Sequence, residues 1–179
     1  MFPREQSAVT KKGYFLSELT GPQTRPHTTT IMAVAMAVGH MVGMYWKDHY
    51  KIARPVQLFP ALNPLITTPG HPTYPSNHSL QAHLIAHALG SVFSASAKLA
   101  MAVQLFAMAA RIAENREIAG VHFPDDSDAG EELASDIFPL LDAVPSFVAL
   151  QDLAKEEWLT LGDPTEVPQR RGVDSSITK

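Results

Sequence analysis

The sequence has 179 residues, of which 45% are hydrophobic and 18% charged. These values are typical of one folded globular domain with a sizeable core. The net charge is −4 and no basic stretch alternates with aromatic residues, which argues against a nucleic-acid-binding surface. The chain has no cysteine, so disulfides, thiolate metal sites and cysteine nucleophiles are excluded.

The N-terminal part favours a flexible segment over residues 1–26, because it is polar and contains several glycines and prolines. It lacks the apolar core of a signal peptide, so we expect a cytoplasmic protein. A long helix is predicted from about 31 to 53, with a cap at residues 28–30 and Pro55 beyond its end. Residues 28–46 carry no formal charge and approach the length of a membrane span. Their threonines, glycines and histidine favour a buried bundle helix instead.

A proline-rich connection follows. Residues 55–76 contain six prolines, which predicts a long irregular loop without helix or strand. Further helices are predicted at about 76–90, 94–119, 126–141 and 146–161, and a polar tail at 162–179. No stretch shows the alternation of a strand. The sequence therefore predicts an all-α fold, an antiparallel helical bundle of about five helices with one long loop, in a domain spanning residues 27–161.

Three short stretches carry the residues suited to chemistry. The first is Lys47-x6-Arg54-Pro55, in which two cations seven residues apart should project from one helix face. Two cations at the end of an apolar helix are costly unless water or an anion meets them. A solvated helix end is the alternative explanation.

The second stretch is Pro75-Ser76-Asn77-His78, where the loop enters a helix. Free N–H groups at a helix N-terminus bind anions, and the Ser76 hydroxyl adds a donor. His78, on the first turn, can transfer a proton to an oxygen of a bound group. A simple helix cap beside a surface histidine would give the same pattern.

The third stretch is Arg116-x5-His122-x3-Asp126, which spans a helix end and the next helix start. An arginine fork suits two oxygens of a phosphate. Asp126 can accept a hydrogen bond from one ring nitrogen of His122 and leave the other free to attack. A histidine satisfied within a helix linker is the alternative.

In order and spacing, the three stretches together resemble the superfamily that joins type 2 phosphatidic acid phosphatases, bacterial non-specific acid phosphatases and vanadium-dependent haloperoxidases. The resemblance covers residues from about 47 to 130 and implies a helical bundle. It implies that phosphate or vanadate oxygens are bound by Lys47, Arg54, Ser76, Asn77 and Arg116.

The resemblance also assigns the reacting groups. His122 would be the phosphohistidine nucleophile of a phosphatase, or the residue bonded to vanadium in a haloperoxidase. His78 would protonate the leaving group, or handle peroxide as an acid–base, and Asp126 would orient His122. Asn77 stands where the family usually has glycine, so its side chain is expected to crowd the oxyanion or to require another backbone angle.

Three functions follow as expectations. The first is a cofactor-free phosphoric-ester hydrolase acting on a small phosphorylated substrate, and the second is a vanadate-dependent haloperoxidase using peroxide and halide. The stretch PGHPTYPSNHS and the following QAHLIAHAL look closer to bacterial haloperoxidase-like sequences. The third is a non-catalytic phosphate- or vanadate-binding relative disabled by Asn77. Only 46 residues precede Lys47, fewer than in many relatives, and a homodimer would cover apolar surface left by a shortened bundle.

The remaining histidines allow a competing interpretation. His83 and His87 are four residues apart on one predicted helix, which is a metal-ligand spacing, and His71 lies upstream. The glutamate of a zinc-protease signature is absent, because Leu84 follows His83. We therefore expect these histidines to line the helix or the pocket, with no metal beyond vanadate on His122.

Overall fold

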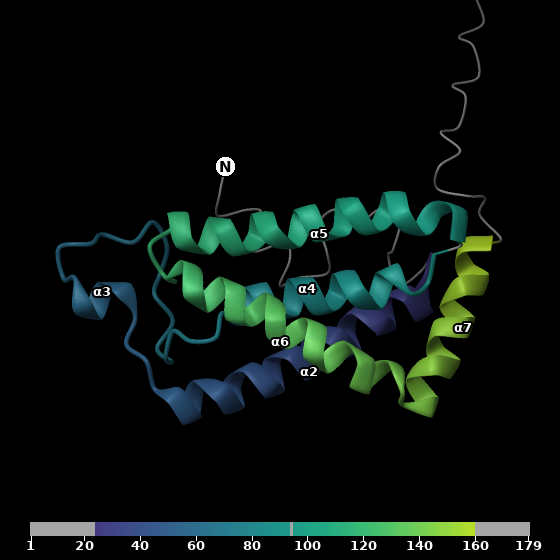
Figure 1. The fold of residues 1–179 in the computed structure, drawn as a ribbon, viewed down its shortest axis with the longest axis horizontal. Helices are drawn as coiled ribbons and strands as arrows, with labels where there is room; N and C mark the ends of the chain where they lie inside the picture. The colour runs from purple at the N-terminus through teal and green to yellow at the C-terminus, as the bar shows by residue number, and fades with distance from the viewer. Residues whose placement is uncertain (1–23, 94, 160–179) are drawn as a thin grey trace, which may run out of the picture.

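The computed structural model describes residues 24–93 and 95–159 and contains helices but no strand within them (Figure 1). The all-α prediction is confirmed. The predicted tail at 162–179 and most of the predicted flexible segment at 1–26 lie outside the described residues. The helices are α2 (Pro26–Tyr50), α3 (Pro55–Leu58), α4 (Asn77–Gly90), α5 (Ala95–Ile118), α6 (Pro124–Asp142) and α7 (Pro145–Leu159).

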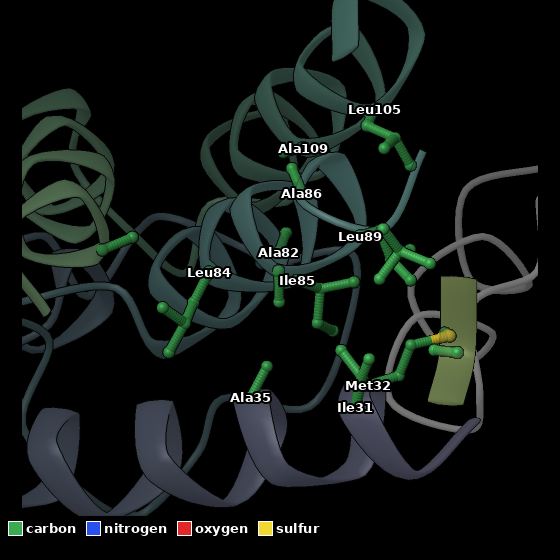
Figure 2. Close-up of a cluster of buried hydrophobic side chains, with 14 of the residues drawn as sticks. Ile31, Met32, Ala35, Ala82, Leu84, Ile85, Ala86, Leu89, Leu105 and Ala109 are labelled. Carbon is green, nitrogen blue, oxygen red and sulfur yellow. The ribbon is translucent and has the colours of Figure 1, made fainter. Parts of the chain in front are cut away.

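Helix α4 is the central element, and it packs against α2, α5 and α6 (Figure 1). Eleven of its fourteen residues are buried, as expected for a helix that is apolar on nearly every side. The core around it contains Ile31 and Met32 from α2, Leu89 from α4, and Leu105 and Ala109 from α5 (Figure 2). This contact surface on three sides fixes where the first turn of α4 lies.

Helix α6 approaches α4 closely because residue 130 is a glycine. A Cβ atom at Gly130 would lie 2.7 Å from the Ser76 carbonyl oxygen and 2.8 Å from Ser79 Cβ. The backbone N–H of Ser76 donates to the carbonyl of Asp126 at 2.8 Å. The starts of α4 and α6 are therefore held side by side.

Helix α2 differs from its predicted bounds at both ends. It begins at Pro26, before the predicted cap at 28–30, because proline suits the first turn of a helix. It ends at Tyr50, since Lys51 takes a left-handed conformation with φ of 51°. Arg54 is thus outside the helix, and the prediction that Lys47 and Arg54 share one helix face is wrong. The loop also contains the one-turn helix α3, where no helix was predicted.

Helix α7 departs from the antiparallel arrangement, because α6 and α7 meet at 92°. Glu157 of α7 accepts hydrogen bonds from the first N–H groups of α2, at 2.7 Å from His27 and 2.9 Å from Thr28. The Arg25 guanidinium lies 3.5 Å from the centre of the Trp158 ring. Helix α7 therefore closes the end of the bundle opposite α3 (Figure 1).

One helical stretch in residues 24–93 and 95–159, Pro26–Leu58, is long and apolar enough to cross a membrane, and α6 and α7 pass the same test only as a bent pair. Mostly buried core helices of soluble proteins and signal sequences near the N-terminus also pass this test. Helix α2 buries one stripe of residues, from Thr28 beside α7 through Ala35 to Lys47 beside the loop. This one-sided burial is what a bundle helix requires.

Candidate active site

The three chemical stretches meet at one end of the bundle, where α2 and α5 end and α4 and α6 begin (Figure 1). The residues after α2 cover this end. The site residues named from the sequence are buried there, with His78 partly buried: Lys47, Arg54, Ser76, Asn77, His78, Arg116, His122 and Asp126. Two helix N-termini, of α4 and α6, add the positive ends of their dipoles.

Lys47 is the buried end of the α2 stripe and has no exposed surface. Its Nζ donates to the carbonyl oxygens of Pro72 at 2.9 Å and Thr73 at 2.6 Å. Burial lowers the pKa of Lys47 to about 7, Arg54 and Arg116 lower it as well, and Asp126 raises it. Because an ammonium has three protons, one remains for an anion in the pocket.

Arg54 ties the loop to the segment before α6. Its Nε donates to the His71 carbonyl at 2.8 Å, and its Nη1 donates to the Val121 carbonyl at 2.7 Å. The same Nη1 lies 3.4 Å from Nε2 of His122. Burial lowers the pKa of Arg54, and the negative charge of Asp126 raises it in part. The guanidinium stays charged at neutral pH. The second cation thus lies directly beside the imidazole.

His122 and Asp126 form a buried pair, with Nδ1 of the imidazole 2.9 Å from Oδ2 of the carboxylate. The same Oδ2 accepts the backbone N–H of Phe123 at 2.9 Å. Burial raises the pKa of Asp126, but hydrogen bonds from His122, Thr73 and Phe123 lower it below its ordinary value, so the group is a carboxylate. It accepts only, which places the proton of His122 on Nδ1.

The pKa of His122 is lowered to about 4, mainly by burial. The hydrogen bond with Asp126 raises it, and the positive charges of Arg54 and Lys47 lower it. The ring is therefore neutral at pH 7, with its Nε2 lone pair turned toward Arg54. This arrangement is that of an activated nucleophile oriented by a third group.

Ser76 is the N-cap of α4, as the sequence predicts, and its Oγ accepts the N–H of Ser79 at 3.4 Å. The side chain is fully buried at the start of the helix. The first N–H groups of a helix have no partner within the helix. Those of Asn77 and His78 are therefore suited to contact an oxyanion.

His78 lies in the first turn of α4, among the cations. Burial lowers its pKa to about 3, and Arg116, His122, Lys47 and Arg54 lower it further. Arg116 itself lies in the last turn of α5, and burial together with Arg54 lowers its pKa to about 10. The charges of Arg116, Lys47 and Arg54 thus all act on the neutral His78. An anion bound near them would offset these charges and raise the pKa of His78.

Thr73 is a site residue that sequence reasoning missed. It is fully buried, and its Oγ1 donates to Oδ2 of Asp126 and lies 3.2 Å from Nδ1 of His122. Nothing in the spacing of a proline-rich loop identifies one threonine as a partner of two residues about 50 positions away. Its position next to Pro72 and shortly before Ser76 was the only available signal.

The side chain of Asn77, which stands at the start of α4, is directed toward α2. The amide lies against α2 at Gly43, where an added Cβ would come within 1.8 Å of the Asn77 Oδ1. Asn77 is helical, and Lys51 is the one non-glycine residue with positive φ in the described parts of the chain. The absence of a side chain at Gly43 therefore leaves the space that the Asn77 amide occupies.

We predict that Asn77 and Gly43 are energetically coupled. Gly43→Ala should cost about 1–3 kcal/mol of unfolding free energy because the new methyl group meets the amide. Asn77→Gly should cost about 1 kcal/mol, through lost packing and a flexible backbone. The double variant should be more stable than the sum predicts, as urea unfolding measures. Additive effects would show that the two residues do not share this space.

His83 and His87 contact residues of α4 and α6. His83 is buried, with Nδ1 2.9 Å from the Ser79 carbonyl and Nε2 3.5 Å from Glu131. The His87 ring stacks on Phe138. No group of three or more metal-ligating side chains occurs in the part of the chain that the structure describes. These histidines line α4, as the sequence favours.

Comparison with known proteins identifies the family. The model of the PAP2 superfamily matches residues 28–131, which is more than half of the chain. The chain therefore belongs to the PAP2 superfamily, and the resemblance seen in its sequence is confirmed. Membership supports an enzyme of the phosphoesterase or haloperoxidase type. No curated protein matches the sequence.

Proposed function

We propose that this PAP2 superfamily member is a phosphoric-ester hydrolase that works through a phosphohistidine at His122 and needs no cofactor. The observation that carries the proposal is the state of His122. Its ring is neutral, Nδ1 is held by Asp126 at 2.9 Å, and Nε2 lies among buried cations. A neutral nitrogen beside cations is suited to attack the phosphorus of a bound phosphate ester.

In the first step, Nε2 of His122 forms a bond to phosphorus as the ester P–O bond breaks. The leaving oxygen takes a proton from His78. In the second step, a water oxygen bonds to phosphorus, the N–P bond breaks, and His78 takes back a proton from that water. Free phosphate then leaves. The general acid and the general base are thus the same residue in opposite protonation states.

The negative charge of the substrate favours the protonated form of His78, which is the form that acts as the acid. Burial and the neighbouring positive charges hold this histidine neutral, with a pKa of about 3. A phosphate group offsets the charges of Lys47, Arg54 and Arg116, so the pKa of His78 rises on binding. His78 therefore gains its proton when a substrate is present to receive it.

The cations also lower the barrier, because charge on the transferring phosphoryl group lies where they are already positioned. The Arg54 Nη1 proton that now faces Nε2 of His122 at 3.4 Å becomes available to a phosphoryl oxygen once that nitrogen bonds to phosphorus. Lys47 contributes its third proton and Arg116 its guanidinium. The N–H groups at the start of α4 complete the donor set.

A second candidate is a vanadate-dependent haloperoxidase, favoured by the neutral state of His78, which burial and nearby cations maintain. A neutral histidine is a base that can take a proton from peroxide. The residues that would hold vanadate are buried at this end of the bundle: Lys47, Arg54, Ser76, Asn77, Arg116 and His122. When bound, vanadate supplies the activation of peroxide for halide oxidation.

A paired assay separates these functions. Purified protein is given a chromogenic phosphate ester, and then peroxide and bromide after loading with vanadate. The proposal expects hydrolysis, and hydrolysis without bromination excludes the haloperoxidase. Bromination without hydrolysis overturns the proposal. If both reactions fail while phosphate binds, the protein is a non-catalytic anion-binding relative.

We predict that anion binding takes up a proton through Lys47. Burial and the neighbouring cations lower the pKa of Lys47 to about 7, and a bound dianion raises it. Between the two pKa values the bound form holds more protons, so affinity must fall as pH rises above about 7, by up to about tenfold per pH unit. Sulfate is the suitable probe because it remains a dianion, and calorimetry from about pH 6 to about pH 9 measures the slope.

Lys47→Met is the matched test of this proton uptake. It should weaken sulfate binding and make the fall in affinity above about pH 7 less steep, because one titrating group is gone while His78 still takes up a proton on binding. Affinity that increases with pH, or an unchanged slope in the variant, would show that Lys47 does not face the anion.

A further inference from the structure

We propose that Thr73 is a positioning residue, whose hydroxyl keeps the His122 proton on Nδ1 and so keeps Nε2 as the reactive nitrogen. Its expected effect on turnover rests on the proposed hydrolysis, but its effect on the imidazole does not. Thr73 lies outside the three stretches from which the site was predicted. The assignment follows from the contacts of its side chain and its backbone.

The hydroxyl of Thr73 lies between the two members of the catalytic pair. Oγ1 contacts Oδ2 of Asp126 and lies 3.2 Å from Nδ1 of His122. A hydroxyl has one proton, and an ionised carboxylate can only accept, so that proton goes to Asp126. The lone pairs of Oγ1 then face Nδ1 and can only accept its proton. Both neighbours of Nδ1 are therefore acceptors, and Nε2 is left without the proton.

The carboxylate of Asp126 is held in place by three hydrogen-bond donors, of which the Thr73 hydroxyl is one. Oδ2 of Asp126 receives the Thr73 hydroxyl, Nδ1 of His122 at 2.9 Å and the Phe123 N–H at 2.9 Å. Without the hydroxyl, two donors remain and the carboxylate gains freedom to turn. Thr73 therefore restricts Asp126, and through it the orientation of the His122 ring.

The backbone of Thr73 holds its side chain in place. Its N–H donates to the Ile52 carbonyl at 2.9 Å, and its carbonyl accepts from Nζ of Lys47 at 2.6 Å. The residue has no exposed surface, so bulk water does not compete for the hydroxyl. A β-branched side chain also has few rotamers. One residue thus links the nucleophile pair to a cation of the oxyanion pocket.

The test compares three variants at this position. Thr73→Val keeps the shape and removes the hydroxyl, Thr73→Ser keeps the hydroxyl, and Thr73→Cys replaces it by a weakly bonding thiol. For Thr73→Val we expect kcat to fall by about 10- to 100-fold, by analogy with the partners that orient metal-ligating histidines, with KM little changed. Thr73→Ser should retain most activity. Thr73→Cys serves as the second variant if valine prevents folding.

Thr28→Val is the matched control. Thr28 is also fully buried, and its hydroxyl is bonded to Glu157 at 2.8 Å at the far end of α2. Loss of this hydroxyl should lower stability without changing kcat. If kcat falls equally in Thr28→Val and Thr73→Val, the effect at Thr73 comes from lost stability. That result would overturn the proposal.

The second readout is independent of turnover. Nitrogen-15 NMR of the imidazole reports which ring nitrogen of His122 carries the proton. We expect the Nδ1–H form in the wild type and in Thr73→Ser, and a measurable share of Nε2–H in Thr73→Val or Thr73→Cys. An unchanged tautomer with unchanged kcat overturns the role of Thr73. If the wild type hydrolyses no ester, the proposed function fails while the tautomer shift still decides the role of Thr73.

Discussion

Replacement of His122 by alanine is expected to lower kcat for phosphate-ester hydrolysis by about 10⁴-fold or more, since removal of a catalytic nucleophile has effects of this size. The reason is the loss of the buried, neutral nitrogen that Asp126 orients through the other side of the ring. Nε2 lies 3.4 Å from Nη1 of Arg54, and no other imidazole of the site is held by a carboxylate in residues 24–93 and 95–159. Steady-state kinetics on the purified variant measures the loss.

Sulfate binding by His122→Ala shows whether the variant has lost only its nucleophile or also the structure of the anion-binding site. The cations Lys47, Arg54 and Arg116 remain in His122→Ala, so the variant should still bind the anion. His87→Ala is the control, since His87 stacks on Phe138 away from these cations and its loss should affect stability more than turnover. If His122→Ala keeps wild-type activity, the proposed nucleophile is wrong.

Asp126→Asn is expected to lower kcat by about 10³- to 10⁴-fold, the size of effect seen when the carboxylate of a catalytic triad becomes an amide. The amide can donate where the carboxylate only accepts, so Nδ1 of His122 is no longer restricted to its protonated form. The Nε2–H tautomer that results cannot attack phosphorus. Kinetics should show a loss in kcat larger than any change in KM.

Asp125→Asn is the matched control for this variant. Asp125 is the neighbouring carboxylate in the same first turn of α6, but it is exposed. Its loss removes the same formal charge near the helix start and leaves the His122 contact intact. Equal losses in both variants would indicate a general electrostatic effect and would contradict the orienting role of Asp126.

The sequence predicts the components of the site better than their geometry. Ser76 as the cap of α4 and the all-helical fold follow from local pattern, because capping and helical periodicity depend on neighbouring residues. The spacing of His122 and Asp126 also indicates their contact, since both lie at one helix start. These are interactions within a few residues of one another.

The errors concern contacts between distant segments. Spacing alone places Lys47 and Arg54 on one helix, but Lys51 ends that helix, and both cations instead bind carbonyl groups of the loop near Pro72. The fit of Asn77 against Gly43 depends on how closely α2 and α4 pack. Thr73 reaches His122 only through the course of the loop. No periodicity in the sequence contains this information.

Trapping of the phosphorylated enzyme tests the central claim most directly. Phosphohistidine survives alkali but not acid, so turnover of a phosphate ester is stopped with alkali and the peptides are analysed by mass spectrometry. The account predicts phosphate on His122 during turnover, and none in His122→Ala. Steady hydrolysis without a phosphorylated His122, or with the phosphate on another residue, would contradict it.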